Sequence, residues 1–171
     1  MEWIFFPRTS QIPNFIEETV SVFEKVSNKI DSSKNDNETR LNSDAVLKIL
    51  EPGLLRLGYK VEKSKKKIDK VRIPVLYGNL GKSELAFEAD AYHEKFQIVI
   101  EVEAGRAVTN YQFLKDIFQA SMMVETEYLV LAVRTLYRNN NDYETVRKFI
   151  ETIYLTNKIK LDLKGILILG Y

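Results

Sequence analysis

The stretch FQIVIEVEAGR, residues 96–106, decides the fold predicted for this 171-residue chain. Its apolar run is typical of a strand buried on both faces, and it ends in Glu101 and Glu103. Because side chains alternate along a strand, both glutamates project from the same face. Asp90 lies on the strand expected over 85–91, and the short connection 92–95 can join the two strands as a hairpin. The pattern therefore predicts that these carboxylates converge at one end of a sheet.

The N-terminal third is predicted to be helical. Apolar residues at helical spacing indicate an amphipathic helix over 14–30, and a very polar connector follows it. A second helix is expected to begin at Ser43 or Asp44, either of which can cap it. Pro52 should break or kink this helix, and Gly58 is a plausible stop at its end.

The C-terminal half alternates helices and strands. A capping box, Thr109-x-x-Gln112, is expected to begin a helix that ends near residue 124. Nearly continuous apolar runs predict buried strands over 128–133 and 166–169, with an amphipathic helix over 142–155 between them. Two shorter strands are expected around the lysine-rich segment, over 59–62 and 71–76.

This order of elements predicts an α/β (α+β) fold, in which a central mixed sheet is flanked by helices. A length of 171 residues suits a single domain, with an N-terminal helix and polar loop over 1–42 and a core over 43–171.

The net charge of +1 conceals two segments of opposite charge. Residues 60–72 carry seven cationic side chains against two acids, whereas residues 83–103 carry six acids against one lysine. A basic segment beside an acidic one suits a protein that handles phosphodiesters with a divalent metal. Two adjacent solvated faces would give the same pattern.

Several classes of site are excluded by composition. The chain has no cysteine, which excludes disulfides, thiolate zinc sites and cysteine nucleophiles, and which agrees with a reducing cytoplasm. The single histidine, His93, excludes a multi-histidine metal site and is expected in a hairpin turn, a poor place for a catalytic triad. Gly81-Lys82-Ser83 lacks the earlier glycine and the following helix of a P-loop. Without a signal-peptide pattern or a long apolar run, a cytoplasmic protein with no membrane contact is expected.

The arrangement of Asp90 and of Glu101-Val-Glu103 resembles the PD-(D/E)xK nuclease superfamily, whose fold many type II restriction endonucleases share. Asp90 and Glu101 match the two acids of that motif, and Glu103 stands where lysine is usual, as in its E-x-E subgroup. The resemblance implies a restriction-endonuclease-like core in which Asp90 and Glu101 hold Mg²⁺, for which Mn²⁺ can substitute. It also implies that Glu103 holds the metal or activates water, and that a homodimer hydrolyses double-stranded DNA.

Further residues are candidates for DNA contacts or for the metal site. The lysine run is expected to bind the DNA backbone through Lys63, Lys65, Lys66, Lys67 and Lys70. Additional DNA contacts are expected from Arg106, Asn110, Lys115 and Gln119, with Phe113, Leu114, Ile117 and Phe118 packing on the opposite side of their helix. An additional acid could come from Asp44, Glu51 or, more weakly, Glu38. Solvated surface is the alternative for each set, and Asp44 could simply be an N-cap.

Two other functions fit the same residues. A non-catalytic DNA-binding or interaction module on this fold would bind nucleic acid even after loss of the acids. A carboxylate-metal hydrolase of small phosphate esters would show no salt-dependent DNA affinity, and the lysine run weighs against it.

Overall fold

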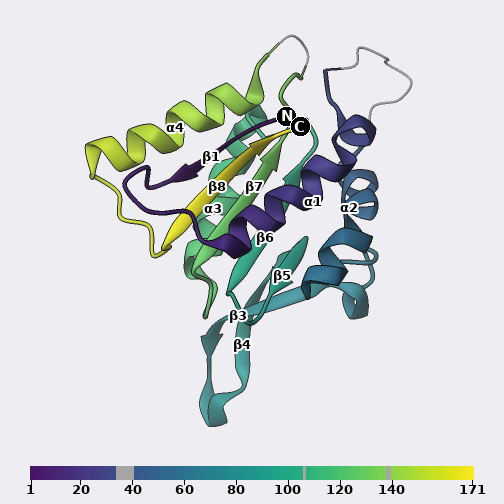
Figure 1. The fold of residues 1–171 in the computed structure, drawn as a ribbon. Helices are drawn as coiled ribbons and strands as arrows, with labels where there is room; N and C mark the ends of the chain where they lie inside the picture. Colours follow the sequence, from purple (N-terminus) through teal and green to yellow (C-terminus); the bar gives the residue numbers. More distant parts are fainter. Residues whose placement is uncertain (34–40, 106, 138–139) are drawn as a thin grey trace.

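A computed structural model describes residues 1–33, 41–105, 107–137 and 140–171, and only the backbone of Asn110. In these residues, six strands form one mixed sheet in the order β1-β8-β7-β6-β5-β2 (Figure 1). These strands are β1 (Glu2–Phe6), β2 (Lys60–Val61), β5 (Ala91–His93), β6 (Ile98–Glu103), β7 (Tyr128–Val133) and β8 (Gly165–Gly170). The central strands β6, β7 and β8 are parallel, and the outer strands β1, β5 and β2 pair antiparallel.

Helices cover both faces of this sheet, as predicted. They are α1 (Asn14–Ile30), α2 (Ser43–Leu57), α3 (Gln112–Met122) and α4 (Asp142–Thr156). Along β6, Ile98, Ile100 and Val102 belong to the core that α1 and α2 cover, whereas Val99 belongs to the core beneath α3 and α4. Alternation therefore directs Glu101 and Glu103 toward the α3 side of the sheet. No helix of the described ranges is long and apolar enough to cross a membrane.

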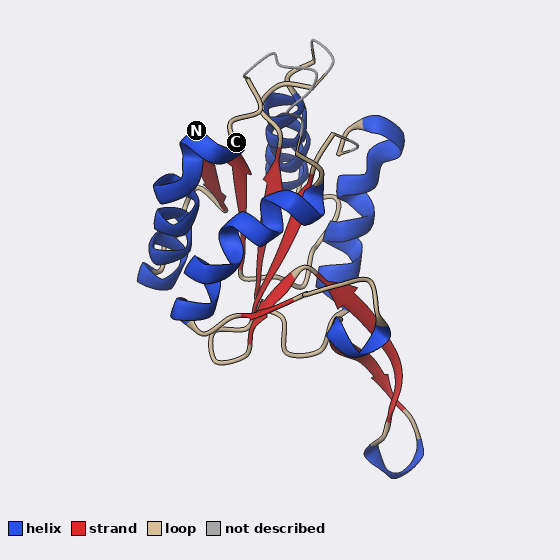
Figure 2. Cartoon of the chain, turned by 90° about the vertical axis from the view of Figure 1, so that its right-hand side faces the viewer, coloured by secondary structure: helices blue, strands red, loops and turns tan. Residues whose placement is uncertain are grey.

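A two-stranded ribbon of β3 (Val71–Tyr77) and β4 (Ser83–Ala89) projects from the body of the molecule (Figures 1 and 2). The short turns η1 (Lys67–Asp69) and η2 (Asn79–Gly81) lie before β3 and at the tip of the ribbon. The strand expected over 85–91 therefore does not pair with the strand of Glu101 and Glu103, except at its last residue, Ala91. Strand β4 pairs with β3, and β5 is the strand that pairs with β6.

A short hairpin does lead into β6, but its first strand is β5, because the chain leaves one sheet at Ala89 and enters another at Ala91. Between them Asp90 uses its side chain, rather than a strand register, to contact β6. His93, expected in a turn, is a buried residue of β5. Its Nδ1 accepts a hydrogen bond from the Phe96 amide, so Nε2 carries the proton and donates to the Leu57 carbonyl at 2.9 Å. Nε2 thus holds β5 against the end of α2, and Nδ1 holds the turn that follows β5.

Helix α2 differs from the prediction at both of the expected irregularities. Its N-cap is Asn42, whose side chain accepts from the Ala45 amide at 2.9 Å, and not Ser43 or Asp44. The helix continues through Pro52, because burial of leucines on either side of the proline offsets a cost of about 3 kcal/mol. Gly58 ends the helix with a φ of 98°, as predicted.

Three further features depart from the predictions. Strand β1, which pairs antiparallel with β8, was not predicted. The capping box is wrong as well, since residues 109–111 form the turn η3 (Thr109–Tyr111) and Tyr111 enters α3 in the left-handed region, with a φ of 55°. Phe118, expected to pack inward, is 47% exposed.

Candidate active site

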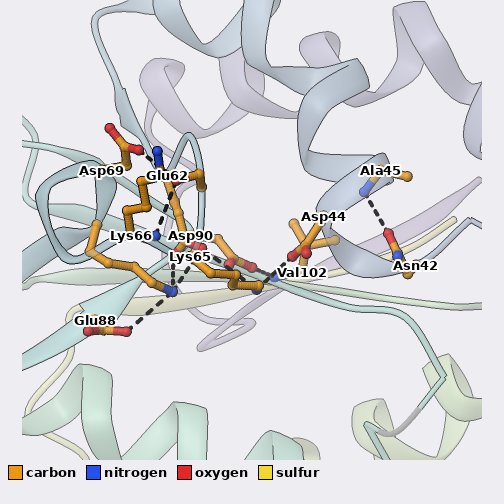
Figure 3. Close-up of polar contacts among 12 residues, drawn as sticks. Asn42, Asp44, Ala45, Glu62, Lys65, Lys66, Asp69, Glu88, Asp90 and Val102 are labelled. Carbon is orange, nitrogen blue, oxygen red and sulfur yellow. Dashed lines mark hydrogen bonds and ion pairs between the residues drawn. The ribbon is translucent and has the colours of Figure 1, made fainter.

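The structure brings Asp90, Glu101 and Glu103 together at the end of β6. Strands β5 and β6 are antiparallel, and Ala91 stands opposite Ile100, so Asp90 lies beside Glu101. The Asp90 carboxylate accepts a hydrogen bond from the Val102 amide at 2.7 Å (Figure 3). This bond holds the Asp90 side chain against the end of β6, the strand that carries Glu101 and Glu103.

A fourth acid, Asp116 of α3, joins this cluster and was not predicted. Asp116 is 4% exposed and lies on the face of α3 that also buries Phe113 and Ile117. The Glu103 side chain interacts with that of Asp116 and lowers its pKa, although burial outweighs this effect. The Oδ2 atom of Asp116 is buried and has no hydrogen-bond partner among the described residues. The signal in the sequence was an acid at an otherwise apolar position of an amphipathic helix.

Burial and mutual repulsion make three of these carboxyl groups, Asp90, Glu101 and Asp116, weaker acids than usual. Burial raises the pKa of Glu101 well above its usual range, and the negative charges of Asp90, Asp116 and Glu103 raise it further. Burial likewise raises the pKa of Asp90 to about 6, against the opposing effect of the Val102 hydrogen bond. The pKa of Asp116 is also raised to about 6, mainly by burial. The cluster therefore carries more negative charge than its surroundings stabilise.

Two lysines offset part of this charge. Lys115, exposed on α3 next to Asp116, lowers the pKa values of Glu101 and Asp116. Lys65 lowers the pKa of Asp90, and its Nζ lies 2.8 Å from Asp44 (Figure 3). Asp44 is thus linked to the cluster through Lys65.

The lysine-rich segment divides into two kinds of residue. Lys70, whose side chain is 13% exposed, forms ion pairs with Glu62 at 2.9 Å and Glu88 at 3.3 Å. Lys63, Lys66 and Lys67 are exposed and form no ion pair with other described residues. Only these three side chains of the run, together with part of Lys65, present charge to solvent.

The remaining candidates are spread around the cluster. Gln119 lies one turn beyond Lys115 on α3 and is half-buried. Glu51 lies two turns beyond Asp44 on α2, and none of the interactions described for the carboxylate cluster involves it. Asn110 belongs to η3. Glu38 and Arg106 lie outside the described residues.

The donor chemistry of the cluster fits Mg²⁺. Mg²⁺ prefers oxygen ligands and usually binds through one or two protein carboxylates while keeping several waters. The buried Oδ2 of Asp116, unpartnered within the described ranges, is an oxygen of that kind. Within those same ranges no three His, Asp or Glu side chains are already arranged as metal ligands.

Comparisons with family models, with curated proteins and with solved structures found no match for this chain.

Proposed function

We propose that this chain is a Mg²⁺-dependent nuclease that hydrolyses phosphodiester bonds in DNA. The observation that carries the proposal is the gathering of four partly or fully buried carboxyl groups at the end of one buried strand. Burying so much negative charge is unfavourable unless a cation compensates it. A site that only stabilised the fold would gain from replacing one of these acids by an apolar residue.

Each acid is given a role by its position. Asp90, just before β5, and Glu101, beside it on β6, would hold the metal, with Asp116 as a further ligand. Bound Mg²⁺ supplies a Lewis acid for the phosphoryl oxygens and lowers the pKa of a water. Glu103, whose side chain interacts with that of Asp116, would exchange a proton with that water. Lys115 contributes a positive charge at the same place, which suits a phosphate oxygen of the substrate.

DNA is favoured as substrate by the exposed lysines near the cluster. Lys63, Lys66 and Lys67 can bind phosphates without reference to sequence. The resemblance to the PD-(D/E)xK superfamily supports double-stranded DNA as the substrate and a homodimer as the active form, because two sites are needed to cut two strands.

The proposal is tested with supercoiled plasmid incubated in Mg²⁺, Mn²⁺ or EDTA. We expect nicking or linearisation by the wild-type protein with either metal and none in EDTA. Asp90→Asn and Glu101→Gln should each slow cleavage by about 100-fold or more, because each removes a metal ligand. Glu24→Gln, an exposed position on α1, is the matched control and should cleave normally.

The three functions give different outcomes in this assay. Cleavage that persists in both cluster variants would contradict the site. DNA binding without cleavage of varied DNA in Mg²⁺ or Mn²⁺ would favour the non-catalytic module. Hydrolysis of a small phosphate ester, without salt-dependent DNA affinity, would favour the third function.

A further inference from the structure

A groove of about 630 Å³ lies between the base of the β3–β4 ribbon and the edge of the main sheet. It is lined by the segment from β2 to β3 and by Tyr92, Glu94, Val124 and Glu125. The second group adjoins the first, since Tyr92 pairs with Lys60 and the Val124 amide donates to the Pro74 carbonyl at 2.8 Å. The groove is adjacent to the carboxylate cluster through Lys70. Lys70 lines the groove, and its Nζ lies 2.9 Å from Glu62, whose charge acts on Asp90.

The groove presents two uncommitted cations. Of its four basic residues, Lys60 is paired with Glu94 at 2.7 Å and Lys70 with Glu62. The other two, Lys63 and Arg72, are exposed and form no ion pair with any residue that the structure describes. Both belong to the segment from β2 to β3. Of the acids that line the groove, Glu94 is paired with Lys60, Asp69 accepts a hydrogen bond from Ser64, and Glu125 follows α3. The two unpaired cations would attract an anionic chain to the segment from β2 to β3.

The segment from β2 to the end of β3 also carries two exposed apolar side chains. Ile68 is 90% exposed and Tyr77 is 54% exposed, and both line the groove. Arg72 and Tyr77 are five residues apart on β3, a separation of about 16 Å at ~3.3 Å per strand residue. The groove is thus lined by cations and an aromatic ring of the same segment, at a spacing that suits several linked nucleotides.

We propose that this groove binds a single-stranded segment of nucleic acid, with phosphates on Lys63 and Arg72 and bases stacked on Tyr77 and packed against Ile68. Cations that follow a backbone, combined with an exposed aromatic ring, are the elements of sequence-tolerant single-strand binding. Base faces are stacked inside a duplex, so Tyr77 can only be used where the strand is unpaired. The inference rests on the proposed function, and it names the substrate as DNA in which an unpaired segment adjoins the cleavage site.

The test is fluorescence anisotropy with a labelled, unstructured 20-nucleotide strand and with the blunt duplex of the same sequence, both in EDTA. We expect the single strand to bind about tenfold more tightly than the duplex. Tyr77→Ala should weaken single-strand binding about tenfold, and Tyr77→Phe, which keeps the ring, should not. Lys63→Ala and Arg72→Ala should each reduce the slope of log Kd against log salt concentration by about 0.7. Lys25→Ala, an exposed lysine on α1, controls for net charge.

Four results would contradict the proposal that this groove binds a single strand. These are equal affinity for strand and duplex, unchanged binding by Tyr77→Ala, equal effects of Lys25→Ala and Arg72→Ala, or no binding of either oligonucleotide. The last would point to a protein partner. Thermal melting of each variant confirms that it is folded. Because EDTA prevents cleavage, a failure here is separable from a failure of the nuclease proposal, which is judged by Asp90→Asn in the plasmid assay.

Discussion

Glu62 and Glu101 are two glutamates that both act on Asp90, yet their surroundings are opposite. The Glu62 side chain is 8% exposed and has Lys70 at 2.9 Å and Lys65 at 3.7 Å. Glu101 is surrounded by the charges of Asp90, Asp116 and Glu103, with Lys115 as the cation that opposes them. The charge of a buried acid with its own lysines is compensated within the fold, whereas an acid among other acids is kept at a cost to stability. The difference separates a structural carboxylate from a candidate catalytic one, and four predictions follow from it.

Removal of the lysine beside Glu62 should have the largest effect on stability. Lys70→Met leaves the buried Glu62 carboxylate with only the more distant Lys65, and breaking a buried pair in this way costs about 3 kcal/mol. Urea unfolding measures the loss. The double variant Lys70→Met/Glu62→Gln should regain most of it, because the charge left uncompensated has also been removed. A single variant as stable as the wild type would show that the Glu62 pair contributes nothing.

Metal binding should stabilise the protein through the carboxylate cluster around Glu101. At about 100 times its dissociation constant, Mg²⁺ should increase the free energy of unfolding by about 2.7 kcal/mol. Glu101→Gln should reduce this gain strongly, whereas Lys70→Met should retain it, since Lys70 contacts Glu62 and Glu88. Thermal melting with and without Mg²⁺ checks both variants. An equal gain in Glu101→Gln would place the stabilising metal elsewhere.

Without metal, removing the charge of Glu101 should stabilise the protein. A carboxyl group whose pKa is higher in the folded than in the unfolded chain holds more protons when folded, so stability falls as the pH rises between the two values. Above the folded-state pKa, the loss is about 1.4 kcal/mol for each unit of difference. Because burial and neighbouring acids raise the pKa of Glu101, Glu101→Gln should be the more stable protein at pH 8.

Chemical unfolding in EDTA at pH 4.5 and pH 8 measures this effect. The advantage of Glu101→Gln should exceed about 1 kcal/mol at pH 8 and shrink toward pH 4.5, where the wild-type carboxyl group is protonated. Glu24→Gln, on the exposed side of α1, should show no such pH dependence. A wild-type protein that is more stable than Glu101→Gln at pH 8 would mean that Glu101 is a structural acid after all.

The sequence predicted those elements whose own pattern was strong. Helix α1 and strand β7 have the predicted bounds, because continuous periodicity or a continuous apolar run determines them locally. The convergence of Asp90 with Glu101 and Glu103 was also predictable from strand alternation. The strand that brings Asp90 there was not, since three residues, Ala91–His93, are too few to give a pattern of their own.

Contacts between segments that are far apart in the chain could not be predicted from the sequence. Asp116 lies near Glu103 only because α3 packs on β6. Lys65, in the segment after β2, forms an ion pair with Asp44 of α2. The two oppositely charged segments, interpreted as a DNA surface and a metal site, also pair with each other through Lys60–Glu94 and Lys70–Glu88. Charge counted along the chain cannot tell a cation that faces solvent from one that is already paired.

That distinction gives the smallest predicted effect, at Lys66 and Lys67. Both are exposed, and neither forms an ion pair with a described residue, so Lys66→Gln/Lys67→Gln should change the unfolding free energy by less than about 0.5 kcal/mol. If these lysines contact DNA phosphates, the slope of log affinity against log salt for duplex DNA should fall by about 0.9 for each. Anisotropy titrations at several salt concentrations, beside urea unfolding, separate the two quantities. A loss of stability comparable to that of Lys70→Met would place these lysines among the internal pairs, and unchanged salt dependence would leave Lys63 and Lys65 as the DNA contacts of this run.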